Sequence, residues 1–306
     1  MERRKCDSEF RRPFKCRKNH RPKIVSLAVA QDEAALSALN KAQKQGLVKA
    51  RLFGDRQKIQ AICEKLHIDI DDFLEVSHQS QDGTALHAAV KAVRQGEADI
   101  LLKGKTHTAK FLRAVLDAES GLRTGRLLSD AFIFEDPHRH GNRLLMITDG
   151  RVNPSPHLDQ KVEILQNAVE VAHRLGNANP KVAVLSAIET VQPQLTSAVD
   201  AALLAKMNQR KQITGCIMDG PLALDNAISV YAAKIKNIDS PVAGQADILL
   251  CPCIESANLL AKCTTYFAGF RLAHVIMGAA APVLIPSRAD SVDSKLLSIA
   301  LGVVVS

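Results

Sequence analysis

The chain has 306 residues, a length that suits two domains better than one. Its 46% apolar and 24% charged residues are typical of a folded soluble protein, and no apolar run is long enough to span a bilayer. The seven cysteines have no regular spacing, which argues against a disulfide-bonded secreted protein and predicts a reducing, cytoplasmic location.

The net charge of +8 is concentrated at the start of the chain. Residues 1–22 hold nine Lys and Arg against Glu2, Asp7 and Glu9, a net charge of +6 that leaves only +2 for all later residues. A basic segment can attract nucleic acid or anionic lipid. This one lacks helical periodicity and has few aromatic residues, so we expect a disordered leader, with neither nucleic acid nor a membrane as partner.

Strand and helix patterns alternate over roughly the next hundred residues. We expect strands at Lys23–Ala30, Val48–Phe53, Phe73–Val76 and Asp99–Leu102. We expect helices at Gln31–Gln45, Gln57–Leu66, Thr84–Gln95 and, after a polar turn, through Leu116. Such alternation predicts a parallel sheet covered by helices on both faces.

A pair of strands follows, Leu127–Phe134 and Arg143–Thr148, which flanks the polar connection Glu135–Asn142 and predicts a hairpin or a sheet edge. Beyond the loop Asp149–His157, rich in Pro and Asn, strands and helices alternate again. Strands are expected at Val182–Leu185, Ile213–Met218, Ile248–Cys251 and His274–Met277, and helices at Leu158–Leu175, Thr196–Asn208, Ala223–Lys234 and Ser256–Phe267.

The segment Pro282–Gly302, PVLIPSRADSVDSKLLSIALG, has the composition of an anion-binding turn. A short apolar strand ends at Pro286, and Ser and Asp residues then lead into a helix whose first backbone N–H groups are unpaired. Those groups and the helix dipole favour an anion, and Arg288 adds a planar fork of donors that matches phosphate oxygens. The alternative is an ordinary capped helix with a solvated Arg.

Three other polar turns follow predicted strands, where ligands bind in open α/β sheets. Lys103–Thr108 resembles the end of a Walker A loop, but Asp99 stands where the first Gly is required, which argues against a nucleotide triphosphatase. Asp219–Asn226 starts with a Gly-Pro turn signal. Cys251–Asn258 holds one close Cys pair with no second ligand pair, so we expect no metal.

Seven segments in the same order resemble the phosphate acyltransferase family, which contains phosphate acetyltransferase and phosphate butyryltransferase. They are ILLKGKTHTAKFLRAVLD, LLSDAFIFE, MITDGRVNPSPHLDQK, PKVAVLSAIETVQP, GCIMDGPLALDNAISVYAA, SPVAGQADILLCPCIESANLLAK and PVLIPSRADSVDSKLLSIA. The SRADS and DGPLALDNAIS forms are closer to the butyryltransferase branch than to the acetyltransferase branch.

The resemblance implies an α/β fold of two α/β/α domains with largely parallel sheets, as in isocitrate and isopropylmalate dehydrogenases, and an active site in the cleft between the domains. It implies a first domain of residues 23–125 plus 275–306 and a second of residues 126–274. It also implies exchange of a short-chain acyl group, butyryl favoured, between coenzyme A and phosphate. Coenzyme A is then a substrate, no cofactor is permanently bound, and the chain forms a homodimer or larger homo-oligomer.

The resemblance also implies the site residues. The expected catalytic residues are Ser287, Arg288 and, as general base, Asp293; the expected substrate-binding residues are Thr108, Arg113, Ser129, Asn258 and Lys262. Acetyltransferases carry an Asp six residues after the Arg, where this chain has Ser294, so the base is Asp293 or Asp290, or this branch deprotonates CoA by a different route. Ala257 also replaces the Gly that precedes the family's Asn.

Two other functions fit parts of the sequence. A dehydrogenase of the related fold would need an Asp-rich metal site and a nicotinamide pocket, and neither is clear in the sequence. A non-catalytic regulatory homologue would use its basic first 22 residues to recruit nucleic acid.

Overall fold

The computed structural model describes residues 21–136 and 143–306. The predicted leader, apart from its last two residues, and most of the predicted connection at 135–142 lie outside the described residues. Contacts divide the chain into two compact units. The first unit consists of residues 21–126 together with Ala273–Ser306, and the second is Leu127–Leu272.

The first unit contains a mostly parallel sheet with the strand order β3-β2-β1-β4-β11-β10. Its strands are β1 (Lys23–Ala28), β2 (Val48–Gly54), β3 (Glu75–His78), β4 (Ile100–Lys103), β11 (Val283–Leu284) and β10 (Leu272–Met277), which begins at the unit boundary. Only β10 runs antiparallel to its neighbour in this order, with Ile276 opposite Val283. β3 begins two residues later than predicted, after the short 3-10 turn Ile70–Asp72.

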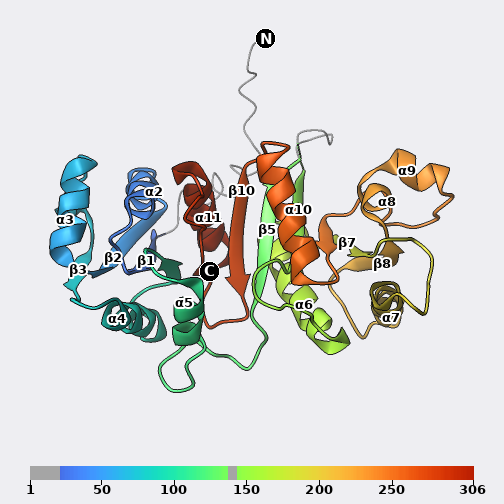
Figure 1. Ribbon diagram of the computed structural model, residues 1–306, viewed down its shortest axis with the longest axis horizontal. Coiled ribbons are helices and arrows are strands. Elements are labelled where there is room, and N and C mark those ends of the chain that lie inside the picture. Colours follow the sequence, from blue (N-terminus) through green and yellow to red (C-terminus); the bar gives the residue numbers. More distant parts are fainter. Residues whose placement is uncertain (1–20, 137–142) are drawn as a thin grey trace, which may run out of the picture. The chain divides into compact units, whose positions relative to one another are not determined.

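Helices cover both faces of this sheet (Figure 1). One face carries α2 (Glu33–Lys44), α3 (Arg56–Lys65) and α11 (Val292–Val305), and the other carries α4 (Asp82–Arg94) and α5 (Thr108–Val115). Side-chain caps fix where helices begin: Asp32 accepts a hydrogen bond from the Ala35 N–H of α2, and Ser291 accepts one from the Ser294 N–H of α11. The predicted doubly covered parallel sheet is therefore confirmed.

The second unit has its own strand order, β5-β6-β9-β7-β8. Its strands are β5 (Ser129–Glu135), β6 (Leu144–Thr148), β7 (Lys181–Leu185), β8 (Ile217–Leu222) and β9 (Ile248–Leu250). β5 and β6 pair antiparallel, as the sequence predicts, and the other neighbours in this order are parallel. One face carries α6 (Leu158–Arg174) and α7 (Thr196–Gln209), and the other carries α8 (Leu224–Ile228), α9 (Val230–Ile235) and α10 (Ile254–Tyr266).

Two sequence predictions in the second unit are wrong. The Gly220-Pro221 pair lies inside β8 rather than in a turn, and Pro is tolerated there because β8 is the last strand of its order and its Pro need not donate to a further strand. The single helix predicted at Ala223–Lys234 is broken into α8 and α9. Ser229 causes the break, because its extended backbone and its hydroxyl form the cap of α9.

The parallel strands of the first unit place three loops at one edge of its sheet. Ala28 of β1 lies opposite Lys103 of β4, and Leu102 of β4 lies opposite Leu284 of β11, so the chain leaves all three strands at the same edge. The loops after β1 and β4 approach closely, since a Cβ atom added to Gly104 would lie 2.3 Å from the carbonyl oxygen of Val29. This edge is where a ligand is expected to bind.

The described part of the chain contains no helix with the length and apolar character needed to cross a membrane.

Candidate active site

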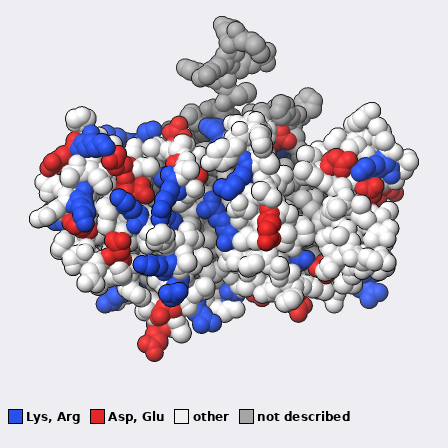
Figure 2. Space-filling model, in the orientation of Figure 1, with Lys and Arg blue, Asp and Glu red and all other residues white. Residues whose placement is uncertain are grey.

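A cavity of about 910 Å³ lies at this edge of the first unit. Four cations line it, and they come from the loop after β4, from α5 and from the turn after β11: Lys105, Lys110, Arg113 and Arg288. Four carboxylates line it as well, Asp32, Glu33, Asp82 and Asp117. On the face drawn in Figure 2, Lys and Arg side chains gather over the region of α2 and α5 that Figure 1 labels. Such a group of cations suits phosphate or a phosphoester.

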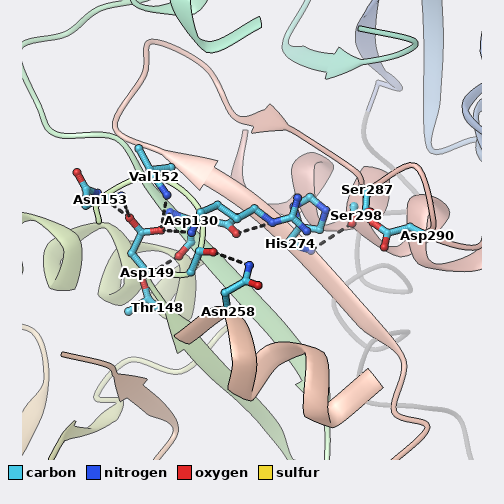
Figure 3. A network of polar contacts seen from close by, with 12 residues as sticks. Asp130, Thr148, Asp149, Val152, Asn153, Asn258, His274, Ser287, Asp290 and Ser298 are labelled. Atoms are coloured by element: carbon cyan, nitrogen blue, oxygen red, sulfur yellow. Dashed lines mark hydrogen bonds and ion pairs between the residues drawn. The ribbon is translucent and has the colours of Figure 1, made fainter. Parts of the chain in front are cut away.

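Arg288 belongs to a tight turn whose backbone is held on both sides of Ser287. The Asp290 N–H donates to the Ser287 carbonyl oxygen at 3.2 Å, and the Ser287 N–H donates to Asp290 Oδ2 at 2.7 Å. Asp290 and Ser287 lie side by side in Figure 3. The Ser287 hydroxyl accepts from the Ala289 N–H at 3.3 Å, and Ser287 itself is not among the lining residues of the cavity.

His107 contacts Arg288 across the cavity, and sequence reasoning missed it. The Nη2 of Arg288 lies 3.4 Å from Nδ1 of His107, the residue that precedes α5. Lys103, a buried residue that is only 4% exposed, fixes the loop that carries His107. Its ammonium donates to the carbonyl oxygens of Gly104 and Thr106, each at 3.1 Å. Two loops of the cavity are therefore fixed through their backbone.

In the second unit, the carboxylate of Asp149 organises the loop after β6. It accepts hydrogen bonds from four backbone N–H groups, those of Asp130, Arg151, Val152 and Asn153, at 2.9–3.2 Å. The side-chain amide of Asn153 adds a fifth at 2.6 Å. Figure 3 shows Asp149 pointing into this loop. Burial, followed by the nearby Asp130 carboxylate, raises the pKa of Asp149 above its ordinary value.

The same loop carries a buried ion pair and contacts α10. Arg151 Nε lies 3.1 Å from Oδ2 of the fully buried Asp130, and the guanidinium stacks over the ring of Phe132 at 4.9 Å from its centroid. The side-chain amide of Asn258, on α10, donates to the Gly150 carbonyl oxygen at 2.9 Å. The TDGRVN segment is thus a rigid polar loop whose importance the sequence reading did not assign to particular residues.

The predicted residues of the first unit fall into two groups. Arg113 and Arg288 line one cavity although they are 175 positions apart in the sequence. Thr108 is the first residue of α5, exposed and outside the lining of the cavity. Asp293 is also outside it: its side chain is 76% exposed and pairs with Lys41 Nζ at 3.3 Å.

The predicted residues of the second unit are not equally accessible. Ser129 is only 2% exposed and its hydroxyl accepts from the Asn167 amide at 2.8 Å, so within this unit it holds β5 to α6. Asn258 is half-buried against the loop of Asp149, and Lys262 is exposed one turn further along α10.

In the Cys251–Asn258 turn, Cys251 is not placed to act as a nucleophile. Cys251 is 4% exposed, and burial raises the pKa of its thiol to about 12, which leaves it protonated at neutral pH. Cys253 precedes α10 and its sulfur lies 3.4 Å from the Ser256 hydroxyl. The described residues also contain no group of three or more His, Cys, Asp or Glu side chains placed to hold a metal ion.

The two α/β units, with two arginines and two lysines in a cavity at the carboxyl edge of a parallel sheet, fit the class of α/β proteins that bind a phosphate or phosphoester there. The chain belongs to the family described as phosphate acetyl/butaryl transferase, a family of acyltransferases, whose model matches residues 72–303.

Curated relatives agree with this family. The chain is 46% identical to the phosphate butyryltransferase of Clostridium beijerinckii, with 93% of each chain covered. It is 43% identical to the probable phosphate butyryltransferase of Bacillus subtilis, with 94% of each covered. It is 42% identical to the phosphate acetyltransferase of Thermotoga maritima, with 92% of this chain and 95% of that one covered.

Solved structures agree as well. A branched-chain phosphotransacylase from Enterococcus faecalis superposes with a TM-score of 0.81 at 32% identity, covering 92% of this chain and 99% of the other. A 4-hydroxythreonine-4-phosphate dehydrogenase from Klebsiella pneumoniae gives a TM-score of 0.56 at 10% identity, which shows a shared fold alone. The expected likeness to dehydrogenase folds is thus confirmed, and a dehydrogenase function is not favoured.

Proposed function

We propose that the protein transfers a short-chain acyl group, with butyryl favoured, between coenzyme A and inorganic phosphate. The reaction is acyl-CoA + phosphate = acyl phosphate + CoA, by direct attack in a ternary complex. The observation that carries the proposal is the convergence of Arg288, Arg113, Lys105 and Lys110 on one cavity in a member of this family. Relatives named phosphate butyryltransferase at 43–46% identity support butyryl, although a phosphate acetyltransferase follows at 42%, so the acyl preference is left to the assay below.

The cations of the cavity suit the charges of this reaction. In the direction of acyl-CoA formation, the CoA thiolate attacks the acyl phosphate carbonyl carbon, a C–S bond forms, and the C–O bond to phosphate breaks. Negative charge grows on the carbonyl oxygen and then on the leaving phosphate. Arg288 can donate to either through its planar fork, and Arg113 adds a second guanidinium. No covalent nucleophile of the enzyme is required.

The thiol proton needs a general base, and Asp293 remains our proposal for that role together with Ser287 as a second active-site donor. The support for Asp293 is its place in the first turn of α11, five residues after Arg288, although its exposed carboxylate pairs with Lys41 outside the lining of the cavity. A general base contributes about 10²–10⁴-fold to the rate, so Asp293→Asn is expected to lower kcat by at least about 10²-fold. Stopped-flow measurement of the rate against pH checks this, and full activity in the variant excludes Asp293.

The remaining substrate contacts are proposed for Thr108, Ser129, Asn258 and Lys262. Their support is their match to the family's motifs, together with the half-buried position of Asn258 beside the Asp149 loop.

The experiment that tests the proposed function is an assay of CoA release from acetyl-, propionyl- and butyryl-CoA, each with and without phosphate. We expect phosphate-dependent release that is fastest with butyryl-CoA. If none of the three thioesters gives phosphate-dependent release, the proposed reaction is wrong. If acetyl-CoA is the fastest, the reaction stands and the butyryl preference is wrong.

We further propose that the protein acts in the cytoplasm as a homodimer or larger homo-oligomer. Cys63, Cys216, Cys251, Cys253 and Cys263 are all free thiols, which fits a reducing compartment. Exposed apolar side chains at the end of α10, Tyr266 and Phe267, support a contact with a second copy.

A further inference from the structure

We propose that Lys295 is a positioning residue for phosphate binding, which acts by fixing the backbone of the Ser287–Arg288 turn. The Lys295 ammonium donates to the Ser287 carbonyl oxygen at 2.7 Å. This inference rests on the proposed function for its kinetic consequences, but its geometry lies entirely within the first unit. Lys295 lies in the last of the segments that resemble the family, but it is not among the site residues that the resemblance implies.

Lys295 is buried to a degree that is unusual for a lysine. It lies in the first turns of α11, its residue is only 3% exposed, and its side chain reaches back eight positions to Ser287. Removing an ammonium from water is costly unless it is hydrogen-bonded, and lysine is rarely buried this fully. An apolar side chain here would avoid this desolvation cost, so the burial of a cation points to a task at the turn.

The charged groups around Ser287 act on both of its peptide units. Its N–H donates to Asp290 Oδ2 at 2.7 Å, and its carbonyl oxygen accepts from Lys295 as well as from the Asp290 N–H. Hydrogen bonds to ionised partners are shorter and stronger than neutral ones. Because both peptide planes are held, the direction in which the chain enters Arg288 is fixed.

A fixed backbone is what the Arg288 side chain needs. Arg288 is exposed in the cavity, and its guanidinium makes a long contact with His107, at 3.4 Å, among the described residues. A flexible side chain reaches a defined position only if its Cα atom is held. A shift of about 1 Å in a positioning group can lower a rate by about 10²-fold. Loss of the Lys295 contact therefore acts on Arg288 without touching the ligand.

The test compares Lys295→Met with a matched control, Lys161→Met. Lys161 is also a buried lysine, 4% exposed, but it pairs with Asp200 at 2.6 Å in the second unit. Both variants lose a buried ammonium and keep most of the side-chain volume, so both are expected to lower the Tm. Only Lys295→Met is expected to raise the KM for phosphate and lower kcat/KM, by about 10–100-fold, with the KM for acyl-CoA changed less than threefold.

A neutral donor separates positioning from packing. Lys295→Gln keeps an N–H donor. We expect its KM for phosphate to lie between the values of the wild-type protein and of Lys295→Met. It also decides the question if Lys295→Met fails to fold. The proposal is overturned if a folded Lys295→Met or Lys295→Gln keeps the wild-type KM for phosphate, or if Lys161→Met raises that KM equally.

A binding measurement separates this inference from the proposed reaction. Inorganic phosphate that binds the folded protein raises its Tm, and the rise depends on the dissociation constant. We expect a smaller phosphate-induced rise in Lys295→Met than in the wild-type protein and in Lys161→Met. If the rise is smaller in Lys295→Met than in the other two proteins, but the wild-type protein transfers no acyl group, the reaction is wrong and the positioning role stands. Equal rises in all three proteins overturn the role of Lys295.

Discussion

Arg288→Ala is expected to lower kcat/KM for acyl transfer to phosphate by about 10³-fold. Loss of one donor that stabilises developing negative charge typically costs about 10²–10³-fold, and Arg288 is proposed to face both the carbonyl oxygen and the phosphate. The other cations of the cavity, among them Arg113, remain in place, so binding is weakened without being abolished. The measurement is the initial rate of CoA release at varied phosphate and varied acyl-CoA.

Two further variants make this result specific. Arg288→Lys keeps the charge but loses the planar fork, so it is expected to recover only part of the activity. Arg271→Ala removes an arginine that pairs with Glu135 at 2.6 Å in a half-exposed position, and it is expected to leave the rate within twofold of wild type. Wild-type efficiency in Arg288→Ala would remove Arg288 from the active site, whatever the reaction proves to be.

Asp149→Ala is expected to lower the free energy of unfolding by about 3 kcal/mol or more. Five hydrogen bonds end on this buried carboxylate, and four of their donors are backbone N–H groups. These four N–H groups stay in the loop when the carboxylate is removed, and they then lack their acceptor. Each buried donor left without a partner costs about 1–3 kcal/mol, and partial entry of water limits the sum. Chemical denaturation followed by circular dichroism measures the change.

The isosteric variant sharpens this prediction. Asp149→Asn keeps the size of the side chain but turns an amide NH₂ toward N–H donors, so we expect it to destabilise the protein nearly as much as Ala does. Asp239→Ala, on an exposed loop, is the control and is expected to change the free energy of unfolding by less than about 0.5 kcal/mol. Near-wild-type stability in Asp149→Asn would mean that shape, and not acceptance of hydrogen bonds, holds the loop.

Sequence patterns were sufficient for most elements because apolar periodicity is a local property. The β5–β6 hairpin and the alternating units follow from it directly. Gly220-Pro221 was misread because a local turn signal was outweighed by the position of β8 at the end of its strand order, which a single sequence does not reveal. The convergence of Arg113 and Arg288 was predictable, since carboxyl ends of parallel strands share one edge.

The supports of the site were not predictable in the same way. Lys103 and Lys295 stand in polar segments where a lysine is ordinarily solvated, and only the three-dimensional structure shows that both are buried beneath backbone carbonyl groups. Asp149 was hidden for a related reason, because an Asp in a loop rich in Pro and Asn looks like a turn residue. Ser129 was assigned from a motif and is buried against Asn167.

Charged and apolar side chains line different parts of the cavity of the first unit. Two of its cations, Lys105 and Arg288, stand in loops whose backbone is fixed by buried lysines, while its apolar part consists of helix side chains such as Ala34, Ile62 and Leu86. A helix side chain can be exchanged for a larger or smaller one without moving a loop. Single substitutions at these helix positions are therefore expected to change the size of the molecule that the cavity accepts, while the loops that carry Lys105 and Arg288 keep their positions.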